Sequence, residues 1–227
     1  RQDGARQRHT PHGGANFAAD VRLAEQDVGE AQRLAAQVGD AAFPAPPAAG
    51  LLPLQVMLDP ANPRAVNVLC AGLNEVIKLD VVSGAILAFV RLRDLLDPSS
   101  LWPAWSMALN RERDEIYVVV NPNDLDLNPL TFKSKIFTLD RRTLAKKKEL
   151  LLEGASIWEL VVREDGRFVY AIDSSRGEVL VIDMDTGTEM SRCAIPVERG
   201  GRLLRADPAQ NRLFVGGWLA GFVNIVE

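Results

Sequence analysis

The residues whose types and spacing best suit chemistry lie in a long polar insertion, NPNDLDLNPLTFKS, at residues 121–134. Within it Asp124, Asp126 and Asn128 alternate as D-x-D-x-N, which is how an EF-hand calcium loop begins. A proline then stands where such a loop requires glycine, and a lysine occupies the twelfth position in place of the bidentate glutamate. We therefore expect no metal site. Long loops on rigid scaffolds usually carry function, so Asn121 and the three alternating residues are candidate binding residues.

Tryptophan provides the second candidate feature. Trp105 and Trp158 stand at matching places, three residues before Ala108 and Val161, each at the start of a run expected to form an inner strand. Two aligned indole rings could face a ligand, since each offers a large apolar surface and one hydrogen-bond donor. The alternative is that both rings pack between neighbouring structural repeats. The sequence leaves both interpretations open.

Histidine and cysteine limit the enzymatic possibilities. Both histidines, His9 and His12, lie near the N-terminus, so the rest of the chain lacks the commonest general base and zinc ligand. A Ser-His-Asp arrangement in the main body is excluded. Cys70 and Cys193 form no CxxC pattern and fall in repeats two units apart, so neither a metal site nor a disulfide is expected. No catalytic residue is predicted, and no particular cofactor is indicated.

The composition is that of a soluble globular protein with enough residues for a substantial core: 227 residues, 47% hydrophobic and 25% charged. The formal net charge of -4 gives no basic footprint for a phosphate backbone, so nucleic acid is not expected as a partner. No apolar run is long enough to span a bilayer, and no segment has the pattern of a signal peptide. The cellular compartment stays open, because a chain that begins with arginine could have lost a leader.

An internal repeat organises the chain. Four strand-like runs end in an acidic residue, namely VIKLD at Asp80, KIFTLD at Asp140, VLVID at Asp183 and FVNIVE at Glu227, with separations of 60, 43 and 44 residues. A period in the forties is typical of propeller blades, and the insertion at residues 121–134 explains the longer interval. Because these acidic residues recur at turns, we expect Asp140 and Asp183 to make structural hydrogen bonds rather than to act in catalysis.

Apolar and polar residues alternate with period two between turn signals, which predicts an all-β fold of four-stranded antiparallel blades over residues 51–227. The predicted strands are 54–58, 65–71, 75–80, 85–92, 105–109, 115–120, 134–139, 146–152, 157–162, 167–172, 178–183, 189–195, 202–206, 212–216 and 221–226. Within the third repeat, Val161, Val169, Ala171, Val179 and Val181 are expected to be nearly inaccessible.

The segment REDGRFVYAIDSSRGEVLVIDMDTGTEMSRCAIPV at residues 163–197 resembles a repeat of the YVTN-type β-propellers. It has the DG turn, a second strand with aromatic residues, a V-x-V-I-D third strand and a TG turn, and the resemblance weakens toward both ends of residues 51–227. The Trp-Asp ending of WD40 blades is missing. The resemblance implies a radial propeller, a fold that serves interaction modules, surface-protein domains, sugar-lactone hydrolases and oxidoreductase domains alike.

The first fifty residues allow two interpretations. Apolar residues from Val21 to Val38 recur at spacings of three and four, which favours a helix over residues 18–38. The same stretch can be laid over residues 177–197 of the third repeat, which favours the remnant of a preceding blade. In either case the three prolines of residues 41–50 indicate a connector.

Strand counting predicts an incomplete propeller. Glu227 would end the third strand of its blade, so we expect either an open arc of four to five blades cut from a longer polypeptide, or an arc completed by a partner or a second copy. The function hypothesis that fits best is a non-catalytic binding module for a protein partner. The alternative is a propeller enzyme domain of the lactonase or the quinone- or haem-dependent oxidoreductase type, which would need carboxylates or ligands converging in the central channel.

Overall fold

The computed structural model describes residues 53–96, 102–121, 132–195, 201–217 and 223–226, and the account below concerns those residues. They form fifteen β-strands and two short 3-10 helices.

Blade 1 comprises β1 (Pro53–Asp59), β2 (Asn62–Cys70), β3 (Glu75–Asp80) and β4 (Ile86–Arg91), followed by the short helix η1 (Leu92–Leu95). Blade 2 comprises β5 (Ala104–Asn110), β6 (Glu115–Val120), β7 (Lys133–Asp140) and β8 (Lys146–Glu153). Blade 3 comprises β9 (Ile157–Val162), β10 (Phe168–Asp173), β11 (Glu178–Asp183) and β12 (Thr188–Ala194). Blade 4 comprises β13 (Gly201–Asp207), the short helix η2 (Pro208–Gln210), β14 (Arg212–Gly217) and β15 (Val223–Val226).

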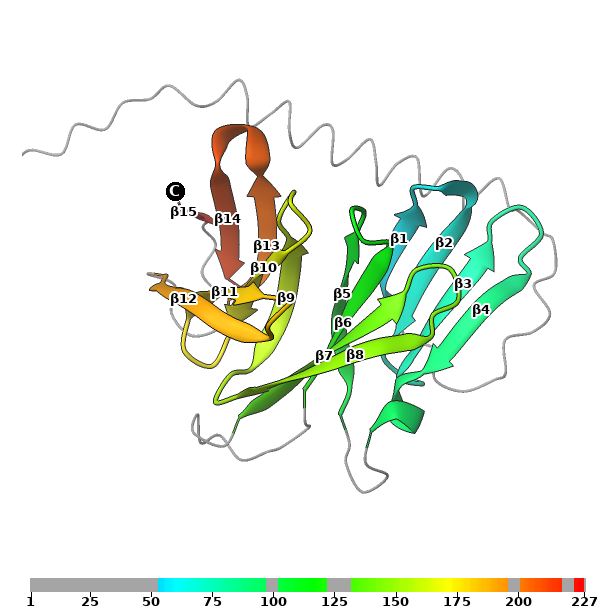
Figure 1. Cartoon of the computed structure of the whole chain (residues 1–227), viewed down its shortest axis with the longest axis horizontal. Coiled ribbons are helices and arrows are strands. Elements are labelled where there is room, and N and C mark those ends of the chain that lie inside the picture. The colour runs from blue at the N-terminus through cyan, green and yellow to red at the C-terminus, as the bar shows by residue number, and fades with distance from the viewer. Residues whose placement is uncertain (1–52, 97–101, 122–131, 196–200, 218–222, 227) are drawn as a thin grey trace, which may run out of the picture.

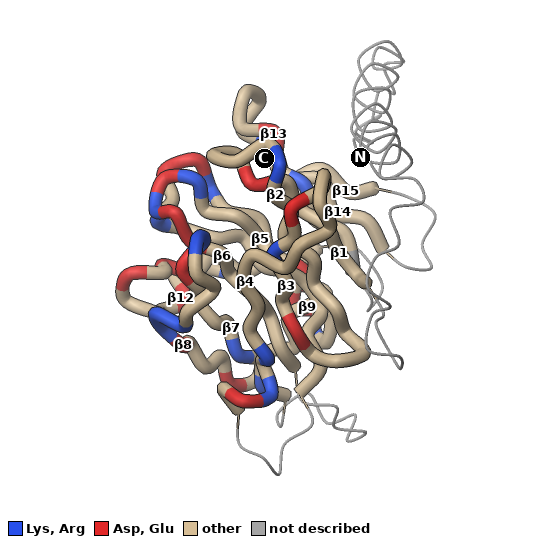
Figure 2. Tube along the Cα trace, turned by 90° about the vertical axis from the view of Figure 1, so that its right-hand side faces the viewer, with Lys and Arg blue, Asp and Glu red and all other residues tan. Residues whose placement is uncertain are grey.

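Each blade is an antiparallel meander, and the four blades follow one another around an arc with β1, β5, β9 and β13 as inner strands (Figure 1). The predicted all-β fold is confirmed, and every predicted strand is present. The fourth sheet has three strands in the described residues, and β15 pairs there with β14 alone. Charged residues gather at the turns and along the outer strands β8 and β12 (Figure 2).

The turn after each third strand depends on its acidic residue, as predicted. The carboxylate of Asp80 accepts the backbone N–H groups of the residues two and three positions ahead, at 2.9 and 2.8 Å. Asp140 repeats this geometry at 3.0 and 2.9 Å, and Asp183 at 2.8 and 3.4 Å. An aspartate at this place therefore builds the same local turn in three blades, which explains why it recurs in the sequence.

These turns end in a residue with positive φ. Gly84 and Gly187 occupy that position in blades 1 and 3, with φ of 71° and 72°. Leu144 occupies it in blade 2 with φ of 59°, a conformation unfavourable for a residue with a side chain. Its side chain is buried in the core between blades 1 and 2, so packing compensates for the backbone strain.

The cores lie between blades, where one sheet face packs on the next. The largest fully buried side chains include Phe137 between blades 1 and 2 and Tyr117 between blades 2 and 3. A third core joins blades 3 and 4 around Ile172 and Val215. The second and third strands of blade 2 are buried on both faces, because a blade lies on either side of them.

One part of the burial prediction is wrong. Val169, Ala171 and Val179 are buried as expected, but Val161 and Val181 remain partly exposed. The reason lies in the neighbouring blade: both side chains line a groove between blades 3 and 4 that the strands of blade 4 do not fill.

A buried ionic cluster fastens blade 1 to blade 2. Asp59, at the end of β1, forms ion pairs with Lys78 of its own blade and Arg141 of blade 2, and all three are almost fully buried. Arg141 also contacts Asp114 at 2.9 Å, and Lys78 donates to the carbonyl of Arg141 at 3.0 Å. Burial alone would raise the pKa of Asp59, but the hydrogen bond from Lys78 and the two positive charges outweigh it and lower that pKa.

We expect Asp59→Ala to lower the free energy of unfolding by about 3–5 kcal/mol, because it leaves Lys78 and Arg141 buried without their shared carboxylate. Urea denaturation at neutral pH measures the change. The control is Asp94→Ala, which removes an exposed carboxylate at 3.8 Å from Arg93 and should change stability by less than about 0.5 kcal/mol. Equal effects of the two substitutions would show that the cluster does not stabilise the junction.

Candidate functional site

Trp105 and Trp158 meet across two neighbouring inner strands. Trp105 lies on β5 and Trp158 on β9, with ring centroids 4.2 Å apart and ring planes tilted by 40°. Both rings are partly exposed, and neither belongs to the cores that join the described blades. The two predicted residues are therefore brought together, as a contact between blades that keeps part of its apolar surface open.

A β-bulge turns each tryptophan out of the regular pleat. The residues on either side of Trp105 pair with two consecutive residues of β6, which leaves Trp105 as the extra residue. Trp158 is the extra residue of an equivalent bulge between β9 and β10. In blade 1 the exposed Leu54 holds the same position. Bulges commonly re-aim one side chain. Sequence alignment of the repeats could find the shared position, but the bulge itself depends on strand register.

Asn121 lies at the base of the insertion and links it to blade 3, and its predicted binding role stays a prediction. Its side chain is buried, donates to the carbonyl of Ile157 at 2.5 Å and accepts the hydroxyl of Ser134 at 2.6 Å. Because Ile157 directly precedes Trp158, this amide ties the base of the insertion to blade 3 beside the tryptophan pair. Its hydrogen-bonding groups are thus engaged within the protein. Asp124, Asp126 and Asn128 lie outside the described residues, so their binding role stays a prediction.

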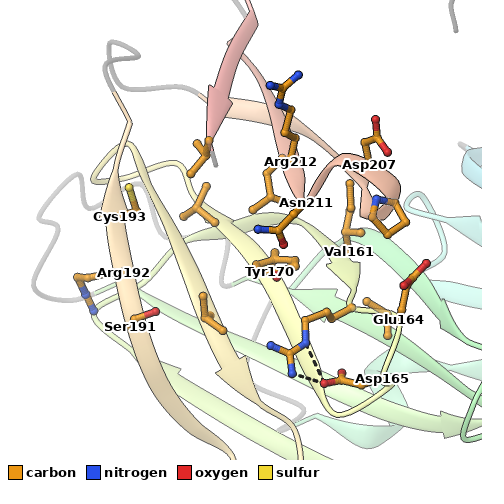
Figure 3. A pocket seen from close by; sticks show the side chains of 18 residues that line it. Val161, Glu164, Asp165, Tyr170, Ser191, Arg192, Cys193, Asp207, Asn211 and Arg212 are labelled. Atoms are coloured by element: carbon orange, nitrogen blue, oxygen red, sulfur yellow. Dashed lines mark hydrogen bonds and ion pairs between the residues drawn. The ribbon is translucent and has the colours of Figure 1, made fainter.

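A groove of about 790 Å³ lies between blades 3 and 4 and runs from their inner strands to β12 (Figure 3). Valines from both blades form its apolar floor, and polar side chains from the turns form its rim. The residues that matter here are Val161, Val181, Val226, Arg163, Asp165 and Arg212. Sequence analysis did not predict this groove, because it depends on how two blades diverge.

At the corresponding place, a described side chain fills each of the other two junctions. There, the residue after the third-strand aspartate reaches back into the preceding blade: Arg141 reaches Asp59, and Met184 is buried in the core between blades 2 and 3. The described residues of blade 4 end on β15 and present no such turn. The groove next to β15 is therefore lined by blades 3 and 4, and no described side chain fills it.

The charges on the rim form a salt bridge rather than an acid–base couple. Nε of Arg163 donates to the Asp165 carboxylate at 2.8 Å, and this bond is the main reason why the pKa of Asp165 falls to about 2. The Arg163 guanidinium also lies over the Phe168 ring at 4.1 Å. A carboxyl group that is ionised at all ordinary pH values cannot act as a general acid.

Within the described ranges, no group of three or more His, Cys, Asp and Glu side chains is arranged to hold a metal ion. Cys70 and Cys193 are free thiols, the first buried and the second exposed. Burial, with the nearby charge of Glu75, raises the pKa of the Cys70 thiol, so it is less reactive than an ordinary cysteine. No helix in the same ranges has the length and apolar character needed to cross a bilayer.

No protein-family model matches this sequence, and no curated protein matches it. Solved structures do match at the level of fold. The RRP9 WD40 repeats align over 77% of this chain with a TM-score of 0.57 and 15% identity. The β-propeller domain of Myceliophteria thermophila Cps50 (Swd1) aligns over 73% with a TM-score of 0.54 and 15% identity. The chain has the β-propeller fold.

A third solved structure that matches is hydrazine synthase from Kuenenia stuttgartiensis, over 77% of this chain with a TM-score of 0.57 and 15% identity. At such identity the likeness concerns the fold alone. The chain spans less than half of each of these structures: 46% of the hydrazine synthase chain, 49% of Cps50 and 48% of RRP9. The predicted propeller is thus confirmed, and the YVTN repeat type stays a prediction.

The ion pair on the groove rim predicts a pH dependence of stability. Because the pKa of Asp165 is lowered from 3.8 to about 2, its contribution is fully present above the higher value and is lost as pH falls through the lower one. We expect Asp165→Asn to be less stable than the wild type at neutral pH and to approach it as pH falls toward about 2. Urea denaturation across this pH range measures the difference.

The matched control is Glu164→Gln, which removes the same charge from the adjacent residue. Glu164 forms no ion pair with the described residues, so its variant should stay close to the wild type at neutral pH. A constant difference between wild type and Asp165→Asn at every pH would contradict the assignment.

Proposed function

We propose that this chain is a non-catalytic binding module that holds a protein partner at the end of the inner strands where Trp105 and Trp158 stack. The observation that carries the proposal is the placement of these rings. Two large aromatic side chains leave the regular pleat at matching bulges, remain partly exposed and stay outside the junction cores. Tryptophan is strongly enriched among the residues that dominate binding energy at protein interfaces.

Two further features support the proposal. The insertion at residues 121–134 starts at Asn121, whose side chain donates to the carbonyl of Ile157, so the described base of the insertion lies beside the pair. The net charge of -4 argues against a nucleic-acid backbone as the partner. Propellers that include WD40 repeats resemble this chain in fold, which adds only a fold-level analogy.

The repeat type that we propose is the YVTN type. Its DG turn corresponds to Asp165 and Gly166, where the carboxylate accepts the N–H of Arg167 at 3.0 Å and the glycine has φ of 67°. A Cβ at Gly166 would lie 2.8 Å from atoms of Asn110 and Glu112 in blade 2, so the turn requires glycine for packing as well.

The enzyme alternative would need free carboxylates on the inner strands. Glu159 on β9 is an inner-strand carboxylate, and it is engaged in joining blades. It accepts the backbone N–H of Leu204 at 2.6 Å and a guanidinium N–H of Arg205 at 2.5 Å, both in blade 4. This engagement favours a structural role for Glu159 over a catalytic one.

We expect peptides selected from a phage-displayed random library on the wild-type chain to lose at least about tenfold in affinity for the Trp105→Ala/Trp158→Ala double variant, a loss typical of hot-spot residues. Binding would be measured by fluorescence anisotropy of labelled peptides. Tryptophan emission of the wild type should change on binding, because the ligand would exclude water from the exposed indole surface.

The matched control is Val82→Ala/Leu87→Ala, which truncates two exposed apolar residues of blade 1 and should leave the affinities unchanged. Circular dichroism confirms that both double variants remain folded. Peptides that bind all three proteins equally, or a selection that enriches no peptide, would count against binding at the tryptophan pair.

A further inference from the structure

We call the face of a blade that points to the next blade its rear face, and the opposite face its front face. At each internal junction the rear face of one blade packs on the front face of the next. The front face of blade 2 shows how completely such a junction covers apolar residues. Five of its apolar side chains are at most 1% exposed, namely Met107, Ile116, Val118, Phe137 and Leu139. Blade 1 covers them, so apolar side chains form the core of this contact, beside the Asp59 ion pairs.

The front face of blade 1 has the same chemistry and no such cover in the described residues. Strand register places Val56, Val66, Val68, Ile77 and Leu79 at the positions of those five residues. Val56 is 57% exposed, and the other four are partly exposed. Across the blade, Val56, Val68, Ile77 and the exposed Phe89 form one continuous apolar row. Contiguous apolar surface of this kind marks an interaction site.

The rear face of blade 4 is uncovered in the same way. Ile225 is 55% exposed, Val223 and Leu203 are exposed, and Phe214 is partly exposed. In blade 2 the position of Phe214 is held by Tyr117, which is buried against blade 3. The two ends of the arc in Figure 1 thus carry opposite halves of the junction that the chain uses internally.

We propose that a second copy of this chain covers both faces, with blade 4 of each copy packed on blade 1 of the other. The repeat itself indicates the partner, because at each internal junction the front face of one blade packs on the rear face of another blade of the same repeat. Together the copies would form a closed ring of eight blades, four from each. A head-to-tail contact closes into a ring when the rotation per copy divides a full turn.

The comparison with other propellers supports two copies rather than three or more. The arc aligns with 46% to 49% of the hydrazine synthase, RRP9 and Cps50 chains, so it covers close to half of each. A ring in which this arc spans the corresponding share needs one more arc to close. Apolar residues predominate on both faces, with Arg205 beside Phe214 on the rear face of blade 4 engaged with Glu159 of blade 3. This composition fits a permanent interface between copies, whose buried core is more apolar than that of transient contacts.

The test is the mass of the full chain by analytical ultracentrifugation between about 1 and 100 µM, since association depends on protomer concentration. We expect the wild type to sediment as a dimer. Val56→Arg and Ile225→Arg should each weaken dimerisation at least about tenfold, because each places a charge in both junctions of a homodimer.

Met190→Arg is the matched control. Met190 is 57% exposed, as Val56 is, but it lies on the outer strand β12 away from both faces. It should dimerise as the wild type does. Circular dichroism establishes that all variants are folded, which is expected because each substitution replaces an exposed side chain.

A mixture of Val56→Arg with Ile225→Arg tests the head-to-tail geometry. One junction of the mixed dimer contains both substitutions and the other contains neither, so we expect the mixture to associate more strongly than either variant alone. A wild type that is monomeric at about 100 µM, or that forms polydisperse filaments, would overturn the proposal. So would an Ile225→Arg variant that dimerises normally, since that result requires contact between two front faces.

Discussion

A blade of this protein has two apolar faces, and each must be covered by a neighbouring sheet. Burial of apolar surface contributes about 25 cal/mol per Å², and a single four-stranded meander with one bare face has too little of it to fold alone. Phe137, Ile116 and Tyr117 reach complete burial only because a second blade lies against them. The stacking of faces therefore determines the arc, and the arc determines which residues remain on the surface.

Polar contacts then fix how neighbouring blades align. The residue that follows the bulged residue of the inner strand bonds to the next blade. In blade 1 the side chain of Gln55 accepts the N–H of Met107 at 2.7 Å, and in blade 3 that of Glu159 accepts the N–H of Leu204 at 2.6 Å. Ser106 holds the same position in blade 2, and its short side chain has no hydrogen-bond partner in the described residues. At that junction Asn110 instead donates to the carbonyl of Gly166 at 2.6 Å. Different residues thus give comparable links at successive junctions.

The strands and the period could be predicted from the sequence because both depend on local chemistry: alternation within a strand and aspartate turns between strands. Features that depend on a neighbouring blade could not. Val181 alternates like a buried residue, yet its exposure is set by what blade 4 places opposite it. The matching positions of Trp105 and Trp158 could be predicted, but their contact depends on two bulges. The hydrogen bond from the buried Asn121 side chain to Ile157 could not be predicted either, because loop position does not reveal it.

One repeat position on the second strand shows how the junctions differ. Tyr117 fills it in blade 2, where burial raises its pKa to about 12 and its hydroxyl is bonded to Asn110 and Glu115. In blade 1 the position holds Asn67, opposite Lys78 in the register.

The smaller Asn67 leaves room at the first junction for a long charged side chain. Lys78 runs from its place opposite Asn67 to Asp59 and to the carbonyl of Arg141, so an ionic cluster replaces the aromatic ring. Asn67 is buried and has no hydrogen-bond partner in the described residues, which costs about 1–3 kcal/mol. The position is aromatic again in Tyr170 and Phe214, and both remain partly exposed. They lie where the arc is open, at the groove beside blade 4 and on its uncovered face.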